Sequence, residues 1–144
     1  MVMRKMIRLT AILILSMSFF GCHIKGQTPE AVKESFQKKY SGENDPDWRV
    51  DKNGNYESHF KRDGNHYRAD FSPEGKWIET EQSIKTKKLP QVVLDILADS
   101  YWQYKVVEVE KVNHHSKGMF YDVELIKDGK KMDVEFTKEG KIIN

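Results

Sequence analysis

The sequence predicts an α+β fold, built as a tandem repeat of one helix plus a four-stranded antiparallel sheet, with the helices packed on one sheet face. Residues 55–78, NYESHFKRDGNHYRADFSPEGKWI, recur sixty-five positions later as FYDVELIKDGKKMDVEFTKEGKII at residues 120–143. An apolar stripe with helical spacing precedes each copy, at an offset of sixty-one. Turn residues and apolar parity match together, which indicates two equivalent halves at residues 28–84 and 89–144.

The first half begins with an amphipathic helix that Pro29 opens. Proline is favoured in the first turn of a helix, where its missing N–H would have no partner in any case. Apolar side chains then recur every four residues, at Val32, Phe36 and Tyr40. This spacing gives the helix one apolar stripe, which we expect to pack on the sheet.

The strands of the first half are predicted around a tight turn at Asp63-Gly64. A two-residue turn sets the register of the whole hairpin and places Tyr56 opposite Phe71 at its far end. Side chains alternate between the two faces of a strand. The side chains expected on the core face are Tyr56, Phe60, Tyr67 and Phe71. Further strands over residues 48–50 and 77–84 complete the expected sheet.

The second half repeats this plan after a junction at residues 85–88. Its expected elements are a helix opened by Leu89-Pro90, a strand over 105–112, a loop over 113–119, a hairpin turning at Asp128-Gly129 and a final strand over 141–144. The apolar stripe of the second helix consists of Val93, Leu97 and Tyr101. We expect the two halves to lie side by side and to share one core.

The first 21 residues have the composition of a signal peptide. A head with three basic residues precedes an apolar run over residues 9–20, which is shorter than the about 20 residues of a membrane span. Gly21, directly before the single cysteine, resembles with Cys22 the processing site of bacterial lipoproteins. We therefore expect lipidation of Cys22 and a short linker over 22–27. Simple cleavage near Gly26-Gln27 and an uncleaved anchor are the alternatives.

Removal of this segment changes the charge of the protein. The first 21 positions hold three of the 24 basic residues and none of the 22 acidic ones, so the rest has 21 basic against 22 acidic side chains, a net charge of about −1 instead of +2. A balanced charge disfavours nucleic acid as a partner, because nucleic-acid binding needs a clustered basic face. With only Cys22, an exported fold must form without internal disulfides.

Helices opened by Pro29 and Pro90, each followed by antiparallel strands with D-G and E-G-K turns, resemble the PepSY-like, beta-lactamase-inhibitor-like family of exported bacterial proteins. The resemblance covers residues 28–144. It implies a periplasmic or envelope-facing domain, a sheet with helices on one side, and a role in binding or inhibiting other proteins.

The sequence contains no nucleophile motif and no pattern typical of a cofactor site. We therefore expect a protein that is not an enzyme and that uses no cofactor. His114-His115 beside Ser116 could form part of a metal site, but adjacent histidines in a polar loop are more commonly solvated. We predict no metal site there.

The second hairpin is expected to carry carboxylates on the face away from the core. The members of this acidic face are Asp122, Glu124, Asp133, Glu135, Glu108 and Glu110. Glu124 is expected opposite Asp133, and Glu108 and Glu110 join this face if Val107 and Val109 point into the core. Like charges directly opposite each other destabilise a sheet, so neighbouring lysines offset them or a cationic ligand binds them. In the first copy the equivalent face is mixed and leans basic.

These observations favour a non-catalytic, protein-binding or inhibitor-like module of the bacterial cell envelope that uses the exposed sheet face. The expected partner is an unknown envelope protein or peptide with a basic surface, and the N-terminal lipid would hold the chain at the membrane. The alternative is a calcium- or cation-binding envelope protein that uses the same carboxylates. A simply solvated face is the third interpretation.

Overall fold

The computed structural model describes residues 28–44 and 46–144, so the predicted signal peptide, Cys22 and the linker lie outside the described residues. In chain order the elements are α1 (Glu30–Lys39), β1 (Asp47–Val50), β2 (Tyr56–Arg62), β3 (Asn65–Phe71), β4 (Trp77–Ser83), the 3₁₀ helix η1 (Thr86–Lys88), α2 (Gln91–Ser100), β5 (Lys105–His114), β6 (Gly118–Lys127) and β7 (Lys130–Phe136). Both helices begin directly after the prolines that were predicted to open them.

The seven strands form one antiparallel sheet in chain order, from β1 to β7. The prediction of a tandem repeat with a four-stranded sheet in each copy is therefore wrong, although the protein is α+β. β4 pairs with β5 from Glu79 opposite His114 to Ser83 opposite Glu110. This pairing satisfies backbone N–H and C=O groups that two separate sheets would leave unpaired at their facing edges.

The second half contributes three strands to the sheet instead of four. Of the predicted final strand, only Ile142 forms a bridge, opposite Phe136. The Asn144 side chain accepts a hydrogen bond from the Glu135 N–H at 3.0 Å and donates one to the Asp133 carbonyl oxygen at 3.0 Å. The Ile143 N–H also donates to the Glu135 carbonyl oxygen at 3.1 Å, so a short backbone contact and the Asn144 side chain together hold this edge of β7.

The hairpin of the first half has the predicted register, with Tyr56 opposite Phe71 at its far end. Asp63 has a φ of 49° and Asp128 has a φ of 50°, and the glycine after each also has a positive φ. Two central residues with positive φ match the right-handed twist of the flanking strands. The predicted loop over 113–119 is wrong in its length, because β5 and β6 both extend into it.

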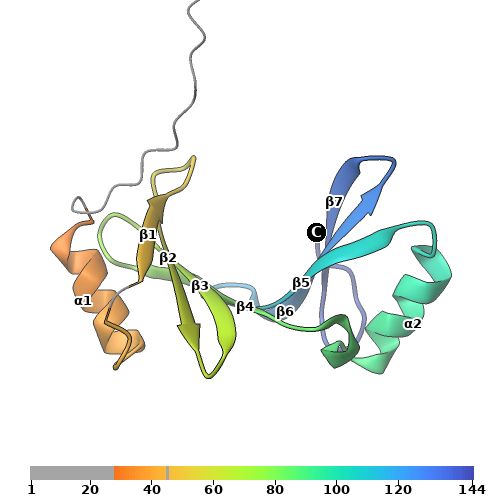
Figure 1. Ribbon diagram of the computed structural model, residues 1–144, viewed down its shortest axis with the longest axis horizontal. Coiled ribbons are helices and arrows are strands. Elements are labelled where there is room, and N and C mark those ends of the chain that lie inside the picture. The colour runs from red at the N-terminus through yellow and green to blue at the C-terminus, as the bar shows by residue number, and fades with distance from the viewer. Residues whose placement is uncertain (1–27, 45) are drawn as a thin grey trace, which may run out of the picture.

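Each helix covers its own hydrophobic core, so the predicted shared core is wrong. Phe36 of α1 packs edge-on against Phe60, with ring centroids 5.2 Å apart, in the first core. Leu97 of α2 packs with Val123 and Phe136 in the second core. Figure 1 shows the two helices at opposite ends of the curved sheet, on its outer side.

Polar residues separate the two cores. Thr80, Gln82 and Lys111 lie on the helix side of β4 and β5, as shown by their pairing with Ala69, Tyr67 and each other across the sheet. Their polar side chains interrupt the apolar surface of the sheet. A core that extended over them would bury polar groups without partners, which costs free energy. Each helix therefore packs on its own group of strands.

The packing of the two cores predicts that Gly75 and Gly140, the glycines of the two E-G-K turns, differ in how much an added Cβ lowers the free energy of unfolding. An alanine Cβ at Gly75, which has a φ of +81°, would lie 2.4 Å from the carbonyl oxygen of Ala31 in α1. At Gly140, which has a φ of +85°, the nearest atoms would be methyl groups of Ile96 and Val92, both at 2.9 Å, and side-chain atoms can shift more easily than the backbone of a helix. At Gly118, with a φ of +76°, nothing lies within 4 Å.

We therefore expect Gly75→Ala to destabilise the protein most, Gly140→Ala less and Gly118→Ala least. Gly118→Ala should cost about 1–2 kcal/mol for the positive φ alone, and the backbone clash at Gly75 should add roughly 1–3 kcal/mol. Urea denaturation of the three variants measures these free energies of unfolding. Equal losses for Gly75→Ala and Gly118→Ala would mean that α1 does not pack against this turn.

Candidate functional site

The face of the sheet without helices carries all six predicted carboxylates. Glu124 lies opposite Asp133, and it also lies opposite Glu108 on its other side. The same register places Asp122 between Glu110 and Glu135. We call the surface formed by these six residues the acidic face. It lies on the inner side of the curved sheet in Figure 1.

A bulge in β5 changes one part of the prediction. Val109 points into the core and is 4% exposed, but Val107 is 41% exposed. The register shifts between Val106 and Glu108, so Val107 stands outside the regular alternation. Glu108 and the carboxylates beyond it still share one face, because pairing resumes in register after the bulge.

The acidic face has an apolar floor. Val112 and Phe120 are cross-strand partners and are 1% and 3% exposed, yet neither belongs to the core under α1 or α2. Their strand parity places them on the same face as Glu110 and Asp122. The ammonium group of Lys117 lies 5.1 Å from the centre of the Phe120 ring. Low-polarity side chains beside carboxylates disfavour their charged form.

The first half adds a buried ionic cluster that the sequence analysis missed. The Nη2 of Arg68 in β3 lies 2.5 Å from Oε1 of Glu81, and its Nε lies 3.4 Å from Oδ1 of Asp70. Glu81 pairs with Val112 of β5, so the cluster adjoins the carboxylate of Glu110. We call Arg68, Asp70, Glu79, Glu81 and Glu110 the ionic cluster. The β3–β4 pairing brings the first four members together, and the β4–β5 pairing adds Glu110.

Carboxylates outnumber cations in this cluster, and the pKa values of Glu81, Glu110 and Asp70 are raised. Burial raises the pKa of Glu81, the Arg68 guanidinium opposes that shift, and the neighbouring Glu110 carboxylate adds to it. Burial likewise raises the pKa of Glu110, that of Asp70 to about 7 and that of Asp122 to about 6. One guanidinium cannot balance the carboxylates that face it, so protons are bound near neutral pH.

Several buried atoms of this region make no hydrogen bond to another protein group. Within residues 28–44 and 46–144, the buried side-chain atoms of this kind are Arg68 Nε, Asp70 Oδ1, Glu81 Oε2 and Asp122 Oδ1. Buried polar atoms normally have partners, and those without one are often found at functional sites. All four lie on the inner face of the sheet.

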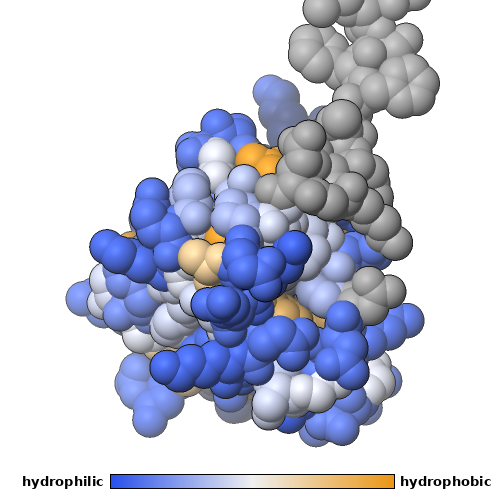
Figure 2. All heavy atoms as spheres, turned by 90° about the vertical axis from the view of Figure 1, so that its left-hand side faces the viewer, coloured by the Kyte–Doolittle hydropathy of each residue, from blue (hydrophilic) through white to orange (hydrophobic). Residues whose placement is uncertain are grey.

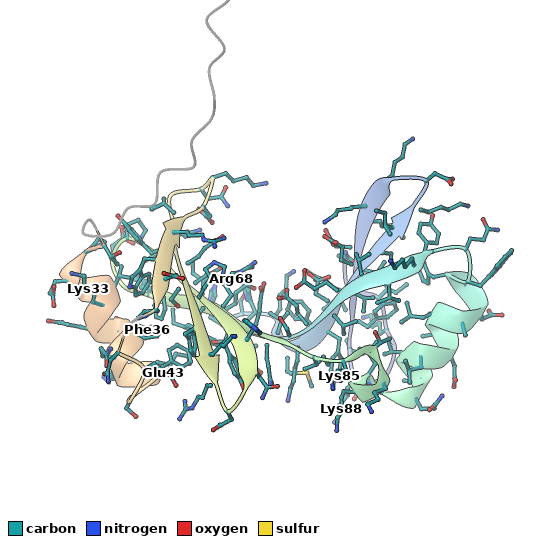
Figure 3. All side chains as sticks on the ribbon, in the orientation of Figure 1. Lys33, Phe36, Glu43, Arg68, Lys85 and Lys88 are labelled. Atoms are coloured by element: carbon teal, nitrogen blue, oxygen red, sulfur yellow. The ribbon has the colours of Figure 1, made fainter. Side chains whose placement is uncertain are left out.

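Two hollows open on this face. The smaller one, of about 210 Å³, is lined by Arg68, Glu81, Glu110, Asp122 and the two rim carboxylates Glu124 and Asp133. A larger one, of about 770 Å³, lies beside it towards β2 and β3, and its lining includes His59, Lys61 and His66. In Figure 3, Arg68 lies on the inner side of the sheet, between the two halves.

The outer surface of the first half differs from the inner face, because the described residues there form no comparable cluster of carboxylates. Figure 2 views the molecule from the α1 side, and the surface there is mostly hydrophilic with small, separate hydrophobic areas. Scattered apolar side chains of this kind are usual on soluble surfaces. The inner face is therefore the better candidate for binding.

Lysines neutralise part of the rim. Lys131 Nζ lies 2.8 Å from Glu124, and Lys117 Nζ lies 2.8 Å from Glu135. The side chains of these lysines are 64% and 46% exposed. Exposed ion pairs contribute only about 0–1 kcal/mol, so a partner can displace them easily. The deeper carboxylates of Glu110 and Asp122 have no lysine partner in the part of the chain that the structure describes.

The histidine pair has a structural role. Nδ1 of His114 accepts hydrogen bonds from the backbone N–H groups of Ser116 and Lys117, at 3.1 and 3.2 Å, which fixes the β5–β6 turn. The His115 ring stacks on it at 4.6 Å. Among the described residues, no group of three or more acidic, histidine or cysteine side chains has the geometry to hold a metal ion.

Comparison with known proteins shows which family the chain resembles. The model of the family described as "Putative beta-lactamase-inhibitor-like, PepSY-like" matches residues 54–144. No curated protein shows significant similarity to the chain. Within residues 28–44 and 46–144, no helix reaches the length and apolarity needed to cross a membrane.

Three solved structures from Bacteroides share this fold. A DUF2874 family protein from Bacteroides uniformis has 22% sequence identity and a TM-score of 0.72, over 81% of this chain and 86% of its own. A protein described as "putative periplasmic" from Bacteroides eggerthii has 20% identity and a TM-score of 0.73, over 83% and 88%. A BLIP-like protein from Bacteroides fragilis has 23% identity and a TM-score of 0.68, over 81% and 83%.

The ionic cluster predicts how stability depends on pH. A carboxyl group whose pKa is higher in the folded than in the unfolded protein binds protons more tightly when folded, so stability is lost as pH rises through that window. Wild-type stability should therefore fall from about pH 4 to pH 7 and beyond. Glu81→Gln keeps the oxygen that faces Arg68 but cannot ionise, and it should flatten this fall.

Urea denaturation at pH 5 and pH 8 measures the effect. The change in the free energy of unfolding between the two pH values should be smaller in Glu81→Gln by about 1 kcal/mol or more, since one pKa unit corresponds to about 1.4 kcal/mol. Glu139→Gln, at an exposed position outside the cluster, is the control and should behave as wild type. Identical pH dependence in all three proteins would contradict the cluster.

Proposed function

The chain belongs to the PepSY-like, beta-lactamase-inhibitor-like family, and from that premise we propose that it is a non-catalytic, exported module of the bacterial cell envelope that binds or inhibits another protein. The acidic face and the ionic cluster together form the binding surface. The observation that carries this proposal is the excess of buried and half-buried carboxylates on one continuous inner face that both halves build.

The charge of this face defines the chemistry of its partner. Glu110 and Asp122 lie beside the apolar floor of Val112 and Phe120, so their surroundings are less polar than water. A cationic side chain placed there would be attracted more strongly than at the open surface. It would also lower the raised pKa values and displace the bound protons. The partner is therefore a protein or peptide with a basic loop or patch.

The shape of the face supports a protein partner over a small molecule. The two hollows are open and adjoin each other along the inner side of the sheet, and their linings are polar or charged. Small-molecule sites are mostly apolar and enclosed. Val112 and Phe120 could supply apolar contact at the centre, with the carboxylates around it, as in protein interfaces with an apolar core and a polar rim.

The envelope location rests on two further observations. One structural relative is described as periplasmic, and the first 21 residues have the composition of an export signal. Lipidation of Cys22 would hold the module at the membrane.

We predict that neutralising the deep carboxylates slows association with the partner. At pH 8, above the pKa of about 6 of Asp122, the variant Glu110→Gln/Asp122→Asn removes negative charge from the inner face while keeping side-chain size. The association rate should fall by roughly tenfold or more, because charge complementarity acts mainly through steering of the encounter. The same rate in wild type should fall as salt rises, since exposed charges are screened over about 8–10 Å.

The experiment uses the immobilised full chain to capture proteins from envelope extract, followed by kinetic measurement with the partner identified by mass spectrometry. Glu34→Gln/Asp99→Asn removes two charges from the outer sides of α1 and α2 and is the matched control. The proposal requires slower association only in the inner-face variant. Equal rates in both variants, unchanged across the salt series, would rule out the acidic face as the binding surface.

A further inference from the structure

A second pocket lies on the opposite face of the sheet, in the saddle between the two helix-covered cores. It has a volume of about 750 Å³, and its lining includes Lys85, Lys87, Lys88, Lys111, Gln82 and Tyr121. We call it the lysine pocket.

The sheet register fixes the floor of this pocket. Gln82 pairs with Lys111, and Lys111 pairs with Tyr121. These three side chains share a face with the core residues of both halves, so they point away from the acidic face. An amide, an ammonium and a phenol group thus stand side by side on three neighbouring strands.

The junction between the halves forms the wall of the pocket. Backbone hydrogen bonds close the 3₁₀ turn, from the Lys88 N–H to the Lys85 carbonyl oxygen at 2.8 Å and from the Leu89 N–H to the Thr86 carbonyl oxygen at 3.0 Å. Leu89 is 5% exposed and anchors the turn in the second core. Figure 3 shows Lys85 and Lys88 on this junction, on the side of the sheet away from Arg68. The turn therefore holds three lysines near Lys111.

The positive charge of the lysine pocket is not balanced locally. No aspartate or glutamate belongs to its lining. Among the ion pairs and side-chain hydrogen bonds of residues 28–44 and 46–144, none involves Lys85, Lys87, Lys88 or Lys111. Elsewhere, Lys117 and Lys131 have carboxylate partners. Four lysines line this one pocket in a protein whose total charge is nearly balanced.

We propose that the lysine pocket binds a compact phosphate group. A phosphate carries up to two negative charges and several acceptor oxygens, which suit several ammonium donors that surround one point. The Gln82 amide and the Tyr121 hydroxyl can add neutral hydrogen bonds from the floor. A carboxylate has fewer acceptor oxygens and less charge, so it would leave more of these donors without a partner.

This site is independent of the proposed partner-binding function. The lysine pocket shares His66 and Ser83 with the larger hollow of the inner face, but none of its lining residues belongs to the smaller hollow between the carboxylates. Two sources can supply such a phosphate: a soluble phosphate ester or pyrophosphate, and the headgroup of an anionic lipid. The two sources share the same chemistry and differ in the experiment below.

The test titrates the full chain with inorganic pyrophosphate and follows backbone amide resonances by NMR. Shift changes should saturate and should cluster at Lys111, Tyr121 and the junction. The variant Lys85→Gln/Lys88→Gln/Lys111→Gln should weaken binding by about tenfold or more, because it removes three charge-assisted donors. The control Lys52→Gln/Lys105→Gln/Lys130→Gln removes the same charge at exposed positions outside the pocket and should bind as wild type.

A second arm uses short-chain phosphatidylglycerol below its micelle concentration, with short-chain phosphatidylcholine as the zwitterionic comparison. Saturable binding of pyrophosphate that the pocket variant loses supports a soluble phosphate ligand. Saturable binding of phosphatidylglycerol alone, lost in the same variant, supports a lipid headgroup. Absence of saturable binding in both arms, or equal losses in the pocket and control variants, would overturn the proposal. The variant Glu110→Gln/Asp122→Asn should leave phosphate binding unweakened, which separates this result from that of the proposed function.

Discussion

The pairing of β4 with β5 is the constraint on which the rest of the structure depends. It joins two helix-and-strand halves into one sheet and satisfies the backbone groups of both facing edges. The same pairing places Glu81 of the first half beside Val112, and through it near Glu110 of the second half. Without it, Arg68 would have carboxylates only from its own half, and Glu110 would lie in the open. The ionic cluster is thus a consequence of how the two halves meet.

Much of this fold could be predicted from the sequence because hairpin register is a local property. The turn at Asp63-Gly64 and the alternation of apolar side chains determine which residues face each other, and the same holds for the carboxylates of the second hairpin. The β4–β5 pairing is not local, and the polar residues of β4 give no periodic signal for it. The shared core and the two separate sheets were therefore wrong predictions, and Arg68 and Glu81 were missed. The bulge that exposes Val107 also leaves no mark in the sequence pattern.

The sheet separates the charges of the molecule into two surfaces. Carboxylates gather on the inner face around Val112 and Phe120, while unpaired lysines gather in the saddle between the helices. A net charge near zero therefore hides two strongly charged regions, which the composition alone does not reveal. The related Bacteroides structures share the fold at identities of 20–23%, and a shared fold does not specify a partner. Specificity must lie in the side chains on these two surfaces.

The central claim is that residues of the two halves meet in one buried ionic cluster across β4 and β5. A double-mutant cycle at pH 8 with Glu81→Gln, Glu110→Gln and the double variant tests it most directly, with urea denaturation as the measurement. Burial and the neighbouring Glu110 carboxylate raise the pKa of Glu81, so at pH 8 the folded protein must either bind a proton there or accept the repulsion between the two groups. Each single change relieves this same cost, so the double variant should gain less than the two single gains together. We predict a coupling energy of about 0.5–3 kcal/mol, as for residues in one network. Additive effects, within about 0.3–0.5 kcal/mol, would contradict the contact between the two halves.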